Sequence, residues 1–181
     1  RQVGEYQIAF REPGFDTLAK AIIFQQLSGR VANTIYNRLA AVAGCPLAPE
    51  KVLKLRPERM RTLGLSKQKI AYIRDLARRT STGAIDFAGL AELDDDQVVE
   101  ELTAIKGVGV WTAHMFLIFA LRRHNVLPVG DLGIRAAIRK AYGLEQLPTP
   151  AEVIRIGERW QPWRTVACWY LWRSVEPDAN L

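Results

Sequence analysis

Apolar residues recur at helical spacing along most of the chain, and we find no convincing pair of strands. The clearest patterns predict helices over 32–42, 67–79 and 132–142. Further helices are expected at 49–55, 57–63, 97–105, 110–121 and 163–175. The first ten residues fit either a short helix or an extended arm. The sequence therefore predicts an all-α fold.

Capping residues mark several helix ends. Asp16 follows Pro13-Gly14 and is expected to cap a helix that runs to Gln26 and is stopped by Gly29. Thr149, Pro150 and Glu152 combine a cap, a first-turn proline and a capping-box acid for the next-to-last long helix. Within 67–79, the helical period places Lys69 on the outward face.

Two glycines, Gly107 and Gly109, stand between two of the predicted helices. Glycine adopts backbone angles that clash with a Cβ, so the chain can reverse sharply here. The second helix then begins with unpaired N–H groups, and Gly109 carries no side chain that would block an anion. This hairpin is therefore expected to bind phosphate.

Asp131 comes a short way beyond the hairpin, as a lone carboxylate in an apolar stretch. It precedes the predicted helix 132–142, which it can cap. The same side chain can also carry out chemistry. Our hypothesis is that the hairpin holds DNA and that Asp131 acts on it.

Composition supports an acidic partner. The net charge is +6 and the isoelectric point is near 9.6, which favours nucleic acid. The two cysteines, Cys45 and Cys168, are expected to be reduced and buried, and they are too few for an iron–sulfur cluster. No apolar run reaches membrane-spanning length and no signal peptide is present, so we expect a protein that is neither secreted nor membrane-bound.

Five blocks together resemble the helix-hairpin-helix (HhH-GPD) DNA glycosylase superfamily. More narrowly they resemble its alkylation-repair branch, the 3-methyladenine DNA glycosylase II type. The hairpin followed at the right distance by an isolated aspartate is the most specific part of the resemblance. The blocks are 25–28 with Ala32, 64–67, 105–116, 128–135 and 160–165.

The resemblance implies two helical lobes with the active-site cleft between them. Lobe A would cover about 18–121, including the hairpin at 97–121, and lobe B would cover about 1–17 and 122–181. Asp131 would lie at the head of a helix that faces the cleft. The backbone carbonyls of Thr103, Ile105 and Val108 would bind Na⁺ or K⁺, which bridges the hairpin to a phosphate. No cofactor is expected for the chemistry itself.

Cleavage of an N-glycosidic bond builds positive charge on the sugar, which a fixed carboxylate at Asp131 stabilises. An alkylated purine already carries positive charge, so it leaves without a general acid. Bifunctional relatives place a Schiff-base lysine where this chain has Trp111. The sequence therefore predicts a monofunctional hydrolase without lyase activity.

The resemblance also assigns the pocket and the DNA contacts. Trp111 and Trp172 would be walls of the base pocket, with Met115 one turn beyond Trp111. Core packing is the alternative role for either tryptophan. The turn at 64–67 would fill the gap left by a flipped base, although it also fits an ordinary turn. The expected DNA-binding residues are Gln26, Ser28, Leu65, Ser66, Lys67, Lys106, Gly107, Gly109 and Thr112.

These expectations combine into a monomeric glycosylase that removes alkylated purines, of the 3-methyladenine and 7-methylguanine type, from double-stranded DNA. It would work in the cytoplasmic nucleoid of a bacterium or in the nucleus of a eukaryote. One alternative is a non-catalytic helix-hairpin-helix DNA-binding module. Another is a glycosylase for oxidised or mismatched bases.

Overall fold

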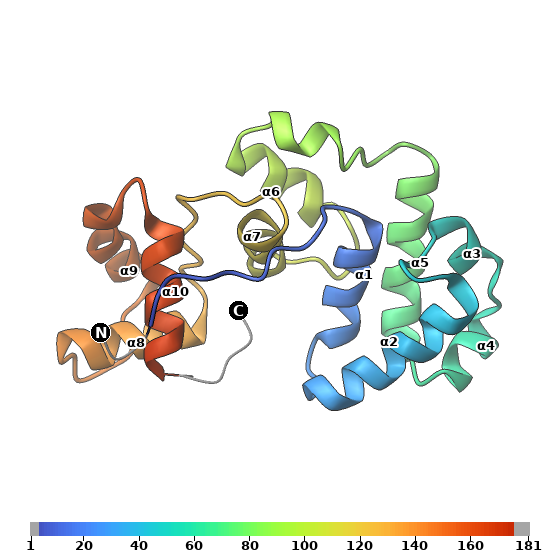
Figure 1. Cartoon of the computed structure of the whole chain (residues 1–181), viewed down its shortest axis with the longest axis horizontal. Coiled ribbons are helices and arrows are strands. Elements are labelled where there is room, and N and C mark those ends of the chain that lie inside the picture. Colours follow the sequence, from blue (N-terminus) through green and yellow to red (C-terminus); the bar gives the residue numbers. More distant parts are fainter. Residues whose placement is uncertain (1–3, 176–181) are drawn as a thin grey trace. The chain divides into compact units, whose positions relative to one another are not determined.

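The computed structural model describes residues 4–175, and every regular element in that range is a helix (Figure 1). This confirms the all-α prediction. The first elements are α1 (Phe15–Phe24), α2 (Gly29–Ala43), α3 (Pro49–Lys54), α4 (Pro57–Thr62), α5 (Lys67–Ser81) and the 3₁₀-helix η1 (Gly89–Glu92). Then come α6 (Asp95–Thr103), α7 (Val110–Phe119), α8 (Leu132–Tyr142), α9 (Pro150–Gly157), η2 (Glu158–Trp160) and α10 (Arg164–Val175).

The chain forms two compact units. Unit 2 is the continuous segment Glu12–Ala113, in which α5 packs against α1, α3 and α4. Unit 1 combines Arg1–Arg11 with His114–Leu181, and its main contact is between α8 and α10. Each unit buries its own apolar core. Fully buried side chains include Leu18, Ile22, Ile73 and Leu76 in unit 2 and Leu117, Ile118 and Ile134 in unit 1.

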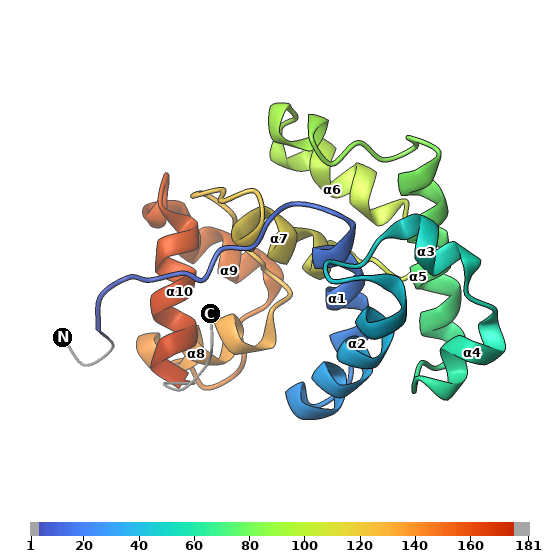
Figure 2. The same cartoon turned by 45° about the vertical axis from the view of Figure 1, so that its right-hand side comes forward.

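Residues 4–13 form an extended arm without a helix, which decides between the two alternatives for residues 4–10. Residues 1–3 lie outside the described residues. The arm runs past α10 in both views of the ribbon (Figure 1, Figure 2). The ring of Tyr6 meets Trp169 edge-on, with centroids 5.5 Å apart. Further along, the guanidinium of Arg122 lies 5.1 Å from the centre of the Phe10 ring. Aromatic and cation–π contacts therefore attach the arm to unit 1.

Local cap chemistry sets the start of α9 as predicted. Thr149 and Glu152 form a complete capping box at α9, and Pro150 is its first residue. Asp16, however, is not the cap of α1, because the helix already begins at Phe15, after Gly14. The carboxylate of Asp16 accepts hydrogen bonds from the Tyr36 hydroxyl at 2.7 Å and the Leu47 N–H at 2.9 Å. It joins α1 to α2 and to the following loop instead.

The predicted end of α1 was also wrong. The helix ends at Phe24, and Gly29 is the first residue of α2 rather than a stop. Lys69 explains the early end, because its Nζ donates to the carbonyls of Ile23 at 2.5 Å and Gln25 at 2.7 Å. Lys69 therefore points inward rather than outward, and burial lowers its pKa.

The two cysteines differ in exposure. Cys168 of α10 is buried as expected, and burial, with the nearby Asp131 charge as a second cause, raises the pKa of its thiol to about 12. Cys45 is exposed, which contradicts the prediction for that residue, because it lies in the loop after α2. Between residues 4 and 175, no helix combines the length and the apolar character that a membrane crossing requires.

Candidate active site

The hairpin between α6 and α7 is a tight turn. The Val108 N–H donates to the Ile105 carbonyl at 3.1 Å, and Gly107 has a φ of +82°. A Cβ added at Gly107 would fall on the ring of Tyr72 from α5. Glycine is therefore required at 107 both by the backbone angle and by this close approach. A Cβ at Gly109 would meet no atom of the described residues within 4 Å, so their packing does not require glycine at this position.

Two side chains from distant parts of unit 2 hold the turn. Gln25 Nε2 donates to the Gly107 carbonyl at 2.9 Å, and Asp75 Oδ2 accepts the Lys106 N–H at 3.1 Å. Asp75 also accepts from Arg79 Nε at 3.1 Å. Burial on its own would raise the pKa of Asp75, but the Lys106 N–H and the Arg79 guanidinium outweigh it and lower the pKa.

Sequence reasoning missed these supporting residues. Asp75 carried a signal, because it is the one acid in α5 and lies between Ile73 and Leu76, on the buried side of the helix. Gln25 stood beside the predicted DNA contact Gln26 but was given no role. Tyr72 could not be identified, because nothing in its own helix indicates a glycine that lies far along the chain.

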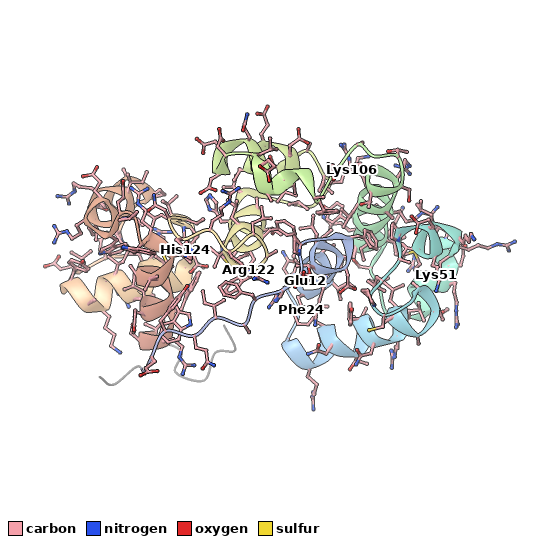
Figure 3. The ribbon with its side chains drawn as sticks, turned by 45° about the horizontal axis from the view of Figure 1, so that its top comes forward. Glu12, Phe24, Lys51, Lys106, Arg122 and His124 are labelled. Atoms are coloured by element: carbon pink, nitrogen blue, oxygen red, sulfur yellow. The ribbon has the colours of Figure 1, made fainter. Side chains whose placement is uncertain are left out.

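Most residues predicted to contact DNA are exposed. They are Gln26, Ser28, Ser66, Lys67, Lys106 and Gly109. Figure 3 labels the Lys106 side chain at the hairpin. Ser66 also caps α5, since its hydroxyl accepts the Lys69 N–H at 3.2 Å.

Two predicted DNA contacts have buried side chains. Leu65 is only 3% exposed, because its side chain turns into the core of unit 2 below the α4–α5 turn. Its role as a wedge stays a prediction. The Thr112 side chain is 5% exposed, since it lies on the inner side of the first turn of α7. At this position only the backbone N–H remains as a candidate phosphate contact.

Asp131 is the N-cap of α8 and is 8% exposed. Its Oδ1 accepts the Ile134 N–H at 2.8 Å and the Trp172 Nε1–H at 2.9 Å. One donor belongs to the helix that Asp131 caps, and the other comes from α10. The capping role is therefore confirmed, and the same bonds fix the direction of the carboxylate.

The three predicted pocket residues lie in different surroundings. Trp111, near the start of α7, is 50% exposed and belongs to unit 2. Met115 is half-buried and belongs to unit 1. Trp172 is 8% exposed, and its ring stacks on Phe119 with centroids 6.2 Å apart. The pocket itself stays a prediction.

The predicted cation site uses neutral backbone carbonyls. The Ile105 carbonyl already accepts the Val108 N–H, but a carbonyl oxygen has a second lone pair for a cation. The Gly107 carbonyl is turned toward Gln25 and was not among the predicted donors. Oxygen donors without charge suit Na⁺ or K⁺, so the residues fit the predicted ion. Among the described residues, no group of three or more His, Cys, Asp and Glu side chains is arranged to hold a metal ion.

Comparison with known families decides the identity of this fold. Residues 19–162 match the model of the HhH-GPD superfamily base excision DNA repair protein. The chain belongs to this superfamily. The HhH-GPD match covers the hairpin, Asp131 and the α5 residues Tyr72 and Asp75 that contact the hairpin. It ends just after η2.

Individual relatives agree with the family match. The DNA-3-methyladenine glycosylase 1 of Schizosaccharomyces pombe is 38% identical over 167 residues, which cover 91% of this chain and 73% of that protein. The putative DNA-3-methyladenine glycosylase YfjP of Bacillus subtilis is 30% identical over 169 residues, 90% of this chain and 59% of that protein.

Solved structures show the same HhH-GPD fold. The S. pombe 3-methyladenine DNA glycosylase Mag1, solved in complex with abasic DNA, matches with a TM-score of 0.83 and 35% identity, over 96% of this chain and 87% of that one. A DNA-3-methyladenine glycosidase from Bacillus halodurans matches with a TM-score of 0.89 and 37% identity, over 99% of this chain and 84% of that one.

Proposed function

We propose that this HhH-GPD protein is a monofunctional DNA glycosylase that removes alkylated purines, such as 3-methyladenine and 7-methylguanine, from double-stranded DNA. The observation that carries the proposal is the buried, doubly hydrogen-bonded carboxylate of Asp131 at the head of α8. The names of the relatives from S. pombe and B. subtilis, and the abasic DNA in the Mag1 structure, support the substrate class.

The chemistry requires a negative charge at a fixed place. As the bond between base and sugar breaks, positive charge develops on the deoxyribose, and a carboxylate held nearby stabilises it. Preorganised charge acts most strongly where water is excluded, which suits a side chain that is 8% exposed. An alkylated purine is a good leaving group, so one carboxylate is sufficient.

The hairpin is proposed to anchor the DNA. N–H groups at the start of α7 would face a phosphate beside Gly109, where open space admits close approach. Lys106 adds positive charge at the same turn. A monovalent cation held by the carbonyls of Thr103, Ile105 and Val108 would supply further attraction for the phosphate.

Trp111 limits the reaction to hydrolysis and supplies an exposed aromatic face for a flipped base. Because tryptophan has no amine for a Schiff base, abasic product is expected to accumulate without strand cleavage. Borohydride is expected to trap no covalent complex between the protein and alkylated DNA. A trapped adduct on a denaturing gel would contradict this part of the proposal.

The decisive experiment separates catalysis from capping. Asp131→Asn keeps a good N-cap and removes the charge, so base release is expected to fall on the order of 100- to 1,000-fold. Released bases are measured by chromatography after incubation with alkylated DNA, and DNA binding is measured in parallel and is expected to persist.

Asp94→Asn is the matched control, because Asp94 caps α6 in the same way through the Gln97 N–H. This variant is expected to release bases at the wild-type rate. Equal release rates for both variants would show that Asp131 is only a cap. No base release by the wild type would favour the rival function, a non-catalytic DNA-binding module.

A glycosylase for oxidised bases is the other rival. The 8-oxoguanine glycosylase/lyase of Clostridium acetobutylicum shares the fold with a TM-score of 0.80, but at 18% identity this likeness concerns the fold alone. Release of 8-oxoguanine in preference to alkylated purines would favour that rival. We further propose that the protein acts as a monomer on cellular DNA, in the nucleoid of a bacterium or the nucleus of a eukaryote.

A further inference from the structure

The N-terminal arm contacts Phe119, which packs against the tryptophan that is hydrogen-bonded to the proposed catalytic carboxylate. Arg11 donates its backbone N–H to the Phe119 carbonyl at 2.8 Å. Its guanidinium lies 5.6 Å from the centre of the Phe119 ring, within the range of a cation–π attraction. The arm therefore holds Phe119, the last residue of α7, by both its main chain and its side chain.

Phe119 in turn packs against the residue that binds Asp131. The Phe119 and Trp172 rings are 6.2 Å apart and inclined by 25°, and the Trp172 Nε1–H donates to Asp131 Oδ1 at 2.9 Å. A hydrogen bond to a carboxylate is strong but depends on direction, so it transmits the orientation of the indole. A continuous series of contacts within unit 1 thus runs from Arg11 through two rings to Asp131.

Gly133 shows how closely the last two groups meet. A Cβ built there would lie 3.1 Å from Asp131 Oδ1 and 3.1 Å from Trp172 Cδ1. Both groups therefore occupy the space that a side chain at 133 would need. The indole reaches the carboxylate over a bare stretch of backbone, and a shift of the ring changes the hydrogen bond directly.

We propose that Arg11, Phe119 and Trp172 are positioning residues, through which the N-terminal arm holds Asp131 in its working orientation. The edge of the Trp172 indole then matters for the reaction, in addition to the face predicted to line the pocket. The effect on the reaction rests on the proposed function, whereas the contacts themselves can be tested without it.

The first test follows the contacts by NMR in the full chain. The chain has five tryptophans, so its ¹H–¹⁵N spectrum carries five indole signals, and Trp172→Phe assigns the one from Trp172. Asp131→Asn is expected to shift this signal, because the charged acceptor is lost. Arg11→Ala is expected to shift this signal in the same direction by a smaller amount. In Arg11→Lys the signal is expected to return most of the way to its wild-type position.

Arg159→Ala is the control, because it removes an exposed arginine from the same unit. It is expected to leave the Trp172 signal in place. An unmoved signal in Arg11→Ala would overturn the proposal, whatever the protein catalyses.

The second test measures single-turnover release of alkylated bases. Trp172→Phe keeps a ring but loses the N–H, and a reduction of about 10- to 100-fold is expected from the loss of a hydrogen bond to a charged group. Arg11→Ala is expected to lower the rate about threefold to tenfold. Its DNA affinity should match that of Arg159→Ala, because both variants lose one positive charge.

Phe119→Leu provides an independent check, since it keeps an apolar side chain and loses the ring. Melting temperatures are compared so that a loss of folding is not mistaken for a loss of positioning. Equal rates for Arg11→Ala and Arg159→Ala would overturn the proposal. If the wild-type chain releases no base, the proposed function fails, and the indole signal still decides whether the arm positions Asp131.

Discussion

Asp75 of unit 2 and Asp131 of unit 1 are both buried, with exposures of 7% and 8%, yet their surroundings differ. Asp75 is flanked by Arg78 at 3.6 Å and Arg79 at 3.1 Å, and it binds the backbone of the hairpin. Oδ1 of Asp131, in contrast, accepts from neutral N–H groups. Two arginines lie beside Asp75, which suits a supporting role, whereas the two N–H groups bound to Oδ1 of Asp131 fix the direction of its carboxylate.

The two sites also differ in how far their contacts reach along the sequence. The hairpin depends on residues 31 and 82 positions away, through Asp75 and Gln25. Asp131 takes one bond from a residue three positions on and another from 41 positions on. Substitutions at widely separated positions in unit 2 are therefore expected to affect DNA binding. The proposed chemistry is expected to depend on a small set of residues in unit 1.

The largest effect on stability is expected at the hairpin. Gly107→Ala forces a Cβ against the Tyr72 ring at a positive φ, which should destabilise the fold by about 3 kcal/mol. Denaturant unfolding measures the change. Gly109→Ala meets open space, so it should leave stability nearly unchanged and weaken DNA binding instead. Equal stability losses would show that Tyr72 does not restrict the turn.

The carboxylate pair gives the next effect. Asp75→Asn should lower stability by about 2 kcal/mol, because a partly buried ion pair with Arg79 and a hydrogen bond to Lys106 are weakened. Asp131→Asn should lower it by less than about 1 kcal/mol, because asparagine also caps helices. Thermal melting measures both. If Asp131→Asn proves the more destabilising, the distinction between support and catalysis is wrong.

The same carboxylate predicts a pH effect. The pKa of Asp75 is lowered in the fold, so its contribution to stability is complete above the ordinary aspartate pKa of about 3.9. It is lost as the pH falls through the lower, folded value. Unfolding of Asp75→Asn should therefore depend less on pH in acid than unfolding of the wild type.

The smallest effect concerns a single phosphate contact. Lys106→Gln should reduce the slope of log affinity against log salt by about 0.9 for duplex DNA, because one counterion fewer is released. Arg159→Ala is a suitable comparison, since it removes a positive charge away from the hairpin. An identical slope for wild type and Lys106→Gln would remove Lys106 from the DNA interface.

The sequence predicted features that local chemistry decides. The capping box of α9 and the cap of α8 follow from residues within one turn, and both were found where expected. Asp16 failed as a cap because Tyr36 and the loop after α2 recruit its carboxylate. Lys69 failed as a surface residue because the end of α1 supplies carbonyls that helical periodicity does not reveal.

In the candidate site, too, some residues could be predicted from the sequence and others depend on packing. The hairpin glycines and Asp131 were identifiable, since their spacing in sequence resembles that of a known family. Their supporting residues were not, because Gln25, Tyr72 and Trp172 meet their partners only after the helices pack. The burial of Leu65, a position assigned by resemblance, could likewise not be predicted from its place in the turn.

The division of the chain into units also bears on its synthesis. Unit 2 is one continuous segment, so all its residues are synthesised before α8 is made. Unit 1 joins the first residues to the last helix, and Trp172 emerges well after Asp131. Since domains generally fold as units during translation, the hairpin can mature on a nascent chain. The proposed catalytic carboxylate acquires its hydrogen bond from Trp172 only when α10 has been made. The N-terminal arm, synthesised first, can pack against Trp169 of α10 only at that stage.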